Sequence, residues 1–332
     1  MADPNLVMPP EAGAPGPAPT PKSTIFRGPD GIRPGWRVLL FLLIVACLFF
    51  ISVVAAIILH GKRNVQMSTL NPLGLSVSEG MIFLFASIAA LIMGRIEKRH
   101  YGQYGLPAHS AFRKNFWIGT LVGFLAISGC LLAIFALHGF QLVGLATHGN
   151  ALFWAALEWT GAFILVGLSE EFAFRGYLQY TLTMGMGFWP AAFFLSALFG
   201  LAHVRNPGES GPGVLSVVIF GLLFCLFLRR TGNLWWAVGF HAGWDWGQTF
   251  FYGVPDSGLS PYHSLFASRF HGPNWLTGGT VGPEASLFTP IALGVVAVLF
   301  HFAYRANRYH PQAGQPKTQA QISAGTPPVA PT

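Results

Sequence analysis

Long apolar runs alternate with short polar or glycine- and proline-rich segments from about residue 37 to residue 306. Runs of roughly bilayer-spanning length occupy residues 37–59, 78–95, 115–138, 151–183, 188–204, 213–230, 233–253 and 285–306. Turn-forming clusters such as NPLG, MGMG, NPGESGPG and TGN separate several of them. The pattern predicts an all-α polytopic membrane protein with about eight transmembrane helices.

The two ends of the chain differ from this pattern. Residues 1–30 and 307–332 are rich in Pro, Ala and Gly and hold too few apolar residues to offset the entropy lost on ordering. We therefore expect disordered tails around a transmembrane helical domain at residues 31–306. Because no apolar stretch occurs before about residue 37, we expect no cleaved signal peptide.

Composition supports a membrane protein. Hydrophobic residues make up 52% of the chain and charged residues only 9%, against about 25% charged residues in soluble domains. The net charge of +7 comes from Lys and Arg at the edges of apolar runs, which is typical of topology signals and not of a nucleic-acid surface. We expect no nucleic-acid partner. The three cysteines lie within apolar runs, so we expect no disulfide framework.

Orientation follows from the same basic residues. A cytosolic N-terminus and an even number of crossings place most of the Lys and Arg residues on the inner side. Only Lys62, Arg63, Arg205 and Arg269 then lie outside. We predict that both termini are cytosolic.

The outer segment at residues 254–284 is long for a loop. It contains several aromatic and histidine residues, among them Tyr262, Phe266 and Trp275. Two interpretations remain open, an interfacial segment anchored by aromatics and a lid over a site, and we favour the first.

The sequence LSEEFAFRG places three charged residues inside the fourth apolar run. An ionisable side chain at membrane depth costs several kcal/mol, so it usually has a partner and a function. Glu171 and Arg175 lie one helical turn apart, whereas Glu170 points about 100° away from Glu171. Glu170 can therefore face a cavity while Glu171 pairs with Arg175. The alternative is a buried ion network that only stabilises helix packing.

Three more polar residues lie in or beside apolar runs. His203 ends the fifth run, and His241 and Asp245 lie one turn apart in the seventh. His203 could instead be an interfacial or capping residue, and His241 with Asp245 a structural pair. If all three join Glu170, the site lies between the fourth, fifth and seventh helices.

These residue types are suited to hydrolysis. A carboxylate and two imidazoles in a pocket of low dielectric constant can activate water and stabilise an oxyanion. With a divalent metal such as zinc, Glu170, His203 and His241 would be the ligands; a reaction without metal remains equally open. The chain lacks HExxH and a GxSxG with a partner histidine, which argues against zincins and serine hydrolases.

The residues EEFAFR (170–175), FGLAH (199–203) and HAGWD (241–245) occur in this order on successive predicted helices. In this the chain resembles the CAAX prenyl protease and bacteriocin-processing (CPBP, or Abi) family of intramembrane proteases. The family's pattern is EExxxR, FxxxH and HxxxN or HxxxD. The resemblance covers about residues 150–250.

The resemblance implies an endopeptidase that cuts a peptide bond in or near the bilayer. It implies that Glu170 is the general base, that His203 positions the water, and that His241 and Asp245 stabilise the oxyanion or complete a metal site. Glu171, Arg175 and Phe199 would support them. The prenyl proteases have Asn where this chain has Asp245, and an ionised Asp cannot donate to an oxyanion. Asp245 is therefore protonated, orients His241 or binds a metal, and we favour orientation of His241. The departure weakens an assignment to prenylated substrates.

The resemblance further implies a membrane-associated peptide or protein substrate and a location in the bacterial inner membrane. Two other classes remain open. One is a non-catalytic scaffold or bacteriocin-immunity protein that keeps the charged cluster for packing. The other is a proton-coupled transporter, for which the sequence offers no visible internal repeat.

Overall fold

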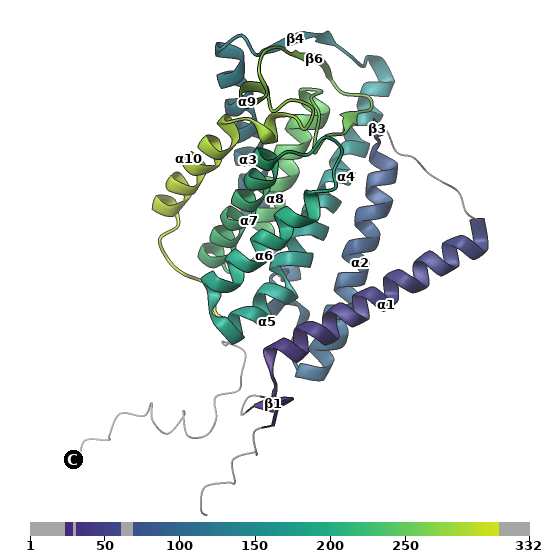
Figure 1. Ribbon diagram of the computed structural model, residues 1–332, viewed down its shortest axis with the longest axis vertical. Helices are drawn as coiled ribbons and strands as arrows, with labels where there is room; N and C mark the ends of the chain where they lie inside the picture. The colour runs from purple at the N-terminus through teal and green to yellow at the C-terminus, as the bar shows by residue number, and fades with distance from the viewer. Residues whose placement is uncertain (1–23, 29–30, 61–68, 312–332) are drawn as a thin grey trace, which may run out of the picture.

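Helices dominate the computed structural model, which describes residues 24–28, 31–60 and 69–311 (Figure 1). They are α1 (Pro34–His60), α2 (Pro72–Glu97), α3 (Lys114–Ala136), α4 (Gly149–Arg175), α5 (Tyr177–Met186), α6 (Phe188–His203), α7 (Gly211–Thr231), α8 (Trp235–Asp245), α9 (Asn274–Thr277) and α10 (Phe288–Ala303). Short turns of 3₁₀-helix, η1 (Tyr101–Tyr104), η2 (Ala108–Ser110) and η4 (Pro283–Ala285), and the π-helical segment η3 (Trp246–Phe251) complete the helical elements.

Each predicted apolar run contains a helix, but two runs are not continuous α-helices. The fourth run divides at Gly176 into α4 and α5, and the seventh continues from α8 into η3. In the described part of the chain, five helical segments are long and apolar enough to cross a membrane. The chain is thus an integral membrane protein. Because α6, α8 and α10 are shorter than these five, a count of eight crossings stays a prediction.

Short strands correct the all-α prediction to a mostly helical fold. Antiparallel pairs form between β1 (Arg27–Gly28) and β2 (Gly31–Ile32) and between β4 (Phe140–Leu145) and β6 (Phe266–Phe270). A parallel pair joins β3 (Thr69–Leu70) to β5 (Ser260–Pro261). Backbone groups outside helices need hydrogen-bond partners, and the loops supply them to one another. As a result the segment 254–284 is held across one end of the helical bundle (Figure 1).

Both ends of the described chain meet at α5. Arg37, near the start of α1, contacts the Met184 sulfur at 3.4 Å, and the Tyr180 hydroxyl donates a hydrogen bond to the Pro311 carbonyl. Residues 1–23 and 312–332 lie outside the described residues. The disordered tails, and the domain limits they define, therefore stay predictions.

Local sequence signals explain where two helices of the cavity wall begin. The Asn71 side chain accepts a hydrogen bond from the Gly74 amide at 2.7 Å, and Pro72 occupies the first helical position of α2. Ser210 caps α7 in the same way through the Gly213 amide. A side-chain cap satisfies one of the free amides at a helix start, so both starts are encoded locally.

The helix α8 lies in the centre of the bundle because its glycines allow α3 to approach closely. A Cβ added at Gly239 would lie 2.1 Å from the Phe116 carbonyl oxygen, and one at Gly123 would lie 2.1 Å from the Phe240 carbonyl oxygen. Helix backbones come this close only where small residues face each other. The packing buries almost every residue of α8, and it fixes the position of His241 and Asp245.

Candidate active site

The last two turns of α4 carry the charged cluster, and its members differ in exposure. The Glu171 and Arg175 side chains are fully buried, whereas the Glu170 side chain remains 24% exposed. Glu170 faces a cavity of about 380 Å³, and Glu171 does not line it. The 100° step between adjacent helical positions accounts for this division.

Glu171 and Arg175 form the ion pair expected from their spacing. The Glu171 Oε1 atom lies 3.4 Å from Arg175 Nη1. The guanidinium carbon of Arg175 lies 4.2 Å from the centre of the Phe199 ring and 5.6 Å from that of Phe224. Cations over aromatic faces are stabilised by about 2 kcal/mol when they are desolvated. Arg175 therefore links α4 to α6 and α7.

His241 is the point where three carboxylates meet. Its Nδ1 lies 3.1 Å from Glu171 Oε1, while its Nε2 lies 3.7 Å from Glu170 Oε2 and 3.5 Å from Asp245 Oδ2. Both ring nitrogens thus face acceptors, and an imidazole can donate from both only in its protonated form. The face of the ring stacks on Phe224 at 5.2 Å. The surroundings of His241 favour an imidazolium.

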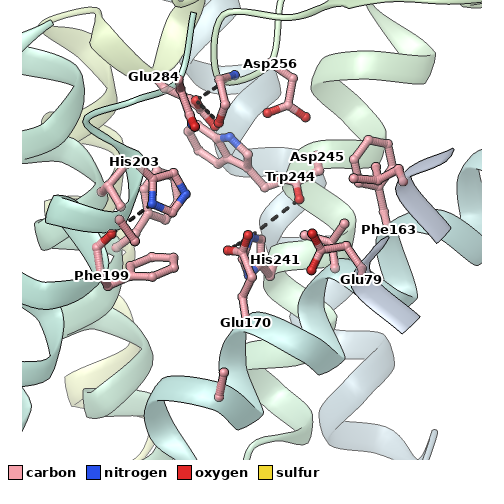
Figure 2. A pocket seen from close by; sticks show the side chains of 18 of the residues that line it. Glu79, Phe163, Glu170, Phe199, His203, His241, Trp244, Asp245, Asp256 and Glu284 are labelled. Carbon is pink, nitrogen blue, oxygen red and sulfur yellow. Dashed lines mark hydrogen bonds and ion pairs between the residues drawn. The ribbon is translucent and has the colours of Figure 1, made fainter. Parts of the chain in front are cut away.

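His203 on α6 lines the same cavity as Glu170 on α4 (Figure 2). Its Nδ1 lies 2.8 Å from the Phe199 carbonyl oxygen, one turn earlier in α6. A carbonyl oxygen only accepts hydrogen bonds, so Nδ1 of His203 donates to it. The Phe199 ring packs edge-on against the imidazole at 4.7 Å. His203 is oriented by its own helix.

The cavity gathers the residues that the sequence singled out on separate helices. Glu170, His203, His241, Asp245 and Phe199 all line it. Much of the remaining wall is apolar and includes Leu70, Leu75, Ile82, Phe163, Val166 and Phe220. Polar groups converge inside an apolar cavity, an arrangement that is typical of binding and catalytic sites.

Three further carboxylates of the cavity wall, those of Glu79, Asp256 and Glu284, were not predicted from the sequence. Glu79 lies on α2, where it interrupts an apolar run much as Glu170 does. A charged residue inside a predicted transmembrane run could have identified Glu79 as a candidate site residue. Asp256 and Glu284 lie in the segment 254–284, and no local pattern marks them because the β3–β5 and β4–β6 pairings determine where the segment lies.

Asp256 and Glu284 form a close acidic group with Asp245. One carboxylate oxygen of each of the three residues lies within 4.8 Å of the others. Burial raises the pKa of Asp256 to about 6. Burial, followed by the nearby charge of Asp256, raises the pKa of Glu284 to about 8. Hydrogen bonds from Ser257 N and Oγ to Glu284 Oε2, at 3.1 and 3.2 Å, oppose this rise. The segment 254–284 thus brings two carboxyl groups with raised pKa values to the cavity.

The proposed metal ligands do not form a metal-binding arrangement. Among the described residues, the only set of three or more Asp, Glu, His or Cys side chains with ligand atoms within 4.8 Å of one another is Asp245, Asp256 and Glu284. Glu170, His203 and His241 are not gathered in this way. We therefore derive no step that requires a metal.

Fold and cavity together define an integral membrane protein with an internal site built from carboxylates and imidazoles. Residues 152–247 match the family described as Rce1-like, type II CAAX prenyl endopeptidase. The match includes the three motifs and so confirms the resemblance to the CAAX protease family. Comparison with curated proteins gives no match. Glu79, Asp256 and Glu284 lie outside the matched region.

Proposed function

We propose that the protein is an intramembrane endopeptidase that hydrolyses a peptide bond in or near the bilayer with water activated by Glu170. The observation that carries this proposal is the convergence of Glu170, His203 and His241 on one cavity from three helices. The matched family is one of prenyl endopeptidases, which supports peptidase chemistry at this cavity.

Glu170 is the general base because it is the carboxylate of the α4 pair that reaches the cavity. Its side chain is 24% exposed, and that of Glu171 is fully buried. A base must lie within hydrogen-bond reach of the proton it removes. Water between Glu170 and His203 can meet this condition, and the ring of His203 helps to orient it.

His241 stabilises the oxyanion that forms when water attacks the substrate carbonyl. An imidazolium donor aimed into a cavity of low dielectric constant stabilises developing negative charge strongly. Asp245 orients this ring through its 3.5 Å contact with Nε2, and Glu171 holds the opposite nitrogen. Arg175 in turn fixes Glu171, and Phe199 supports the guanidinium.

The substrate is a membrane-associated peptide or protein. Apolar residues of the cavity wall, among them Leu75 and Phe163, can accommodate an apolar segment of a substrate that enters from the bilayer. The family match points toward prenylated CAAX substrates, while Asp245 departs from the Asn of the prenyl proteases. An assay of the protein should therefore include both prenylated and non-prenylated peptides.

We also place the protein in a bacterial inner membrane with both termini in the cytosol. The distribution of Lys and Arg supports this orientation. The two ends of the described chain, which meet at α5, are consistent with it.

The test compares membrane proteomes, including released peptides, of cells that carry the wild-type protein or Glu170→Gln. We expect peptides with new ends in or beside transmembrane segments only with the wild type. The same peptides in both strains would contradict a peptidase. An intact cellular phenotype with Glu170→Gln would instead indicate a scaffold.

A further inference from the structure

Glu79 on α2 brings a second carboxyl group to the cavity that contains Glu170. Both residues line it, and Figure 2 shows their side chains beside His241. Glu79 belongs to a membrane-spanning helix. Among the residues that the structure describes, no Lys, Arg or His lies within ion-pair distance of Glu79. An unpaired carboxylate is costly in this setting, so a neutral carboxylic acid is favoured.

The contact between Glu79 and Ser169 supports a proton on Glu79. The Ser169 Oγ atom lies within hydrogen-bond distance of two oxygens, Glu79 Oε2 at short range and the Val166 carbonyl oxygen at 3.0 Å. A hydroxyl has one hydrogen and two lone pairs. If Ser169 donates to Val166, the second contact is satisfied only when Glu79 supplies the proton.

Packing alone does not explain a glutamate at this position. The cavity wall next to Glu79 consists of apolar residues such as Leu75, Ile82 and Val166. A glutamine would make the same hydrogen bond to Ser169 and carry no ionisation cost. What glutamate offers beyond glutamine is a transferable proton at the cavity surface.

We propose that Glu79 is the general acid that protonates the leaving amine. This inference rests on the proposed peptidase function and adds a residue outside the region that matches the family. Two carboxyl groups then divide the proton transfers, with Glu170 ionised as base and Glu79 neutral as acid. Paired carboxyl groups in different environments are suited to such a division.

The proton balance closes without another reactant. Glu170 takes a proton from water as the water oxygen bonds to the substrate carbonyl carbon, and the carbonyl electrons move to the oxygen facing His241. When the carbonyl re-forms, the C–N bond breaks and the nitrogen takes the proton of Glu79. The proton on Glu170 then passes to Glu79 through water. Net, one water yields a carboxylic acid and an amine.

The test uses two probes on the purified full-length protein in detergent. One is a quenched-fluorescent membrane peptide that the wild type cleaves, and the other is the p-nitrophenyl ester of its acyl portion. A nitrophenolate leaves without protonation, so ester hydrolysis needs the base but not the acid. The variants are Glu79→Gln, Ser169→Ala, Glu170→Gln and, as a control, Glu158→Gln, which changes an exposed glutamate of α4.

For Glu79→Gln we expect peptide kcat to fall about 100-fold or more, with KM and ester hydrolysis within about threefold of wild type. Ser169→Ala should lower the peptide-to-ester rate ratio less strongly, and Glu158→Gln should leave both rates unchanged. If Glu79→Gln cleaves the peptide normally, or loses both reactions equally, Glu79 is not the proton donor.

Two further variants distinguish failure of the inference on Glu79 from failure of the proposed peptidase function. If Glu79→Gln does not fold, as judged by thermal unfolding, an unchanged peptide-to-ester ratio in Ser169→Ala overturns the inference. Glu170→Gln should lose both reactions. Retention of both by Glu170→Gln would overturn the proposed function itself, whatever Glu79 does.

Discussion

A single carboxylate oxygen of Glu171 lies 3.1 Å from His241 Nδ1, and the same oxygen lies 3.4 Å from Arg175 Nη1. All three side chains are largely or fully buried. The contact joins α4 to α8, so the orientation of the imidazole depends on a residue that does not itself line the cavity. This relationship yields the first prediction.

Glu171→Gln should destabilise the protein and impair catalysis together. Removing one partner of a buried ion pair leaves the other charge uncompensated, which typically costs about 3–5 kcal/mol. We expect a clear fall in the thermal unfolding midpoint in detergent and a fall in peptide kcat, because Arg175 and His241 lose the negative charge that lies between them. Glu158→Gln is the matched control. Wild-type stability in Glu171→Gln would show that the ion pair contributes little.

The variant Phe199→Leu tests whether the aromatic face of Phe199 contributes more than its apolar volume. Leucine keeps most of the apolar volume but removes the aromatic face 4.2 Å from the Arg175 guanidinium carbon. The lost cation–π interaction is about 1–2 kcal/mol at a desolvated site. We expect a modest fall in the unfolding midpoint and a larger fall in kcat, since Phe199 also packs on His203. Unchanged kcat would argue against a supporting role for this ring.

Asp245→Asn should retain activity, and Asp245→Ala should not. The asparagine oxygen can still accept from His241 Nε2, and its amide can also donate to an oxyanion. We expect kcat/KM of Asp245→Asn within about tenfold of wild type, and a loss of about 100-fold or more in Asp245→Ala. Equal losses in both variants would show that the negative charge of Asp245 is required.

Glu284 should make stability fall as the pH rises. Its pKa is raised from 4.5 to about 8 in the folded protein, so the folded state binds its proton more tightly than the unfolded state. The free energy of unfolding is then greatest below the unfolded-state pKa and declines as pH rises through the folded value. Asp256 adds to this decline at lower pH because its pKa is raised to about 6.

In Glu284→Gln the decline should therefore be smaller. The measurement is the thermal unfolding midpoint at about pH 5 and about pH 9, for wild type, Glu284→Gln and the control Glu158→Gln. A parallel decline in all three proteins would show that Glu284 does not titrate in this range.

Contacts between residues of the same helix could be predicted from the sequence because they depend only on the spacing of the two residues along the chain. Glu171 with Arg175 and His241 with Asp245 have the spacing that brings side chains together on one helical face, and both pairs lie within 3.5 Å. The order of the three motifs also allowed the family resemblance, which the match over residues 152–247 confirms. The catalytic roles of these residues stay predictions.

The contacts between distant segments were not predictable in the same way. Glu79 and Ser169 are 90 positions apart, and only the docking of α2 on α4 brings them together. Asp256 and Glu284 reach the cavity because strand pairs hold the segment 254–284 across the bundle. Hydropathy runs do not encode such pairings, and this is also why the small strands were missed.

Cleavage of a quenched-fluorescent membrane peptide, with and without a farnesylated cysteine, by purified wild type and Glu170→Gln tests the central claim most directly. Glutamine keeps the shape of the side chain but cannot accept the proton of water. We predict cleavage by the wild type and by Glu158→Gln, and a loss of about 100-fold or more in Glu170→Gln with an unchanged unfolding midpoint. Equal cleavage by wild type and a folded Glu170→Gln would contradict the account.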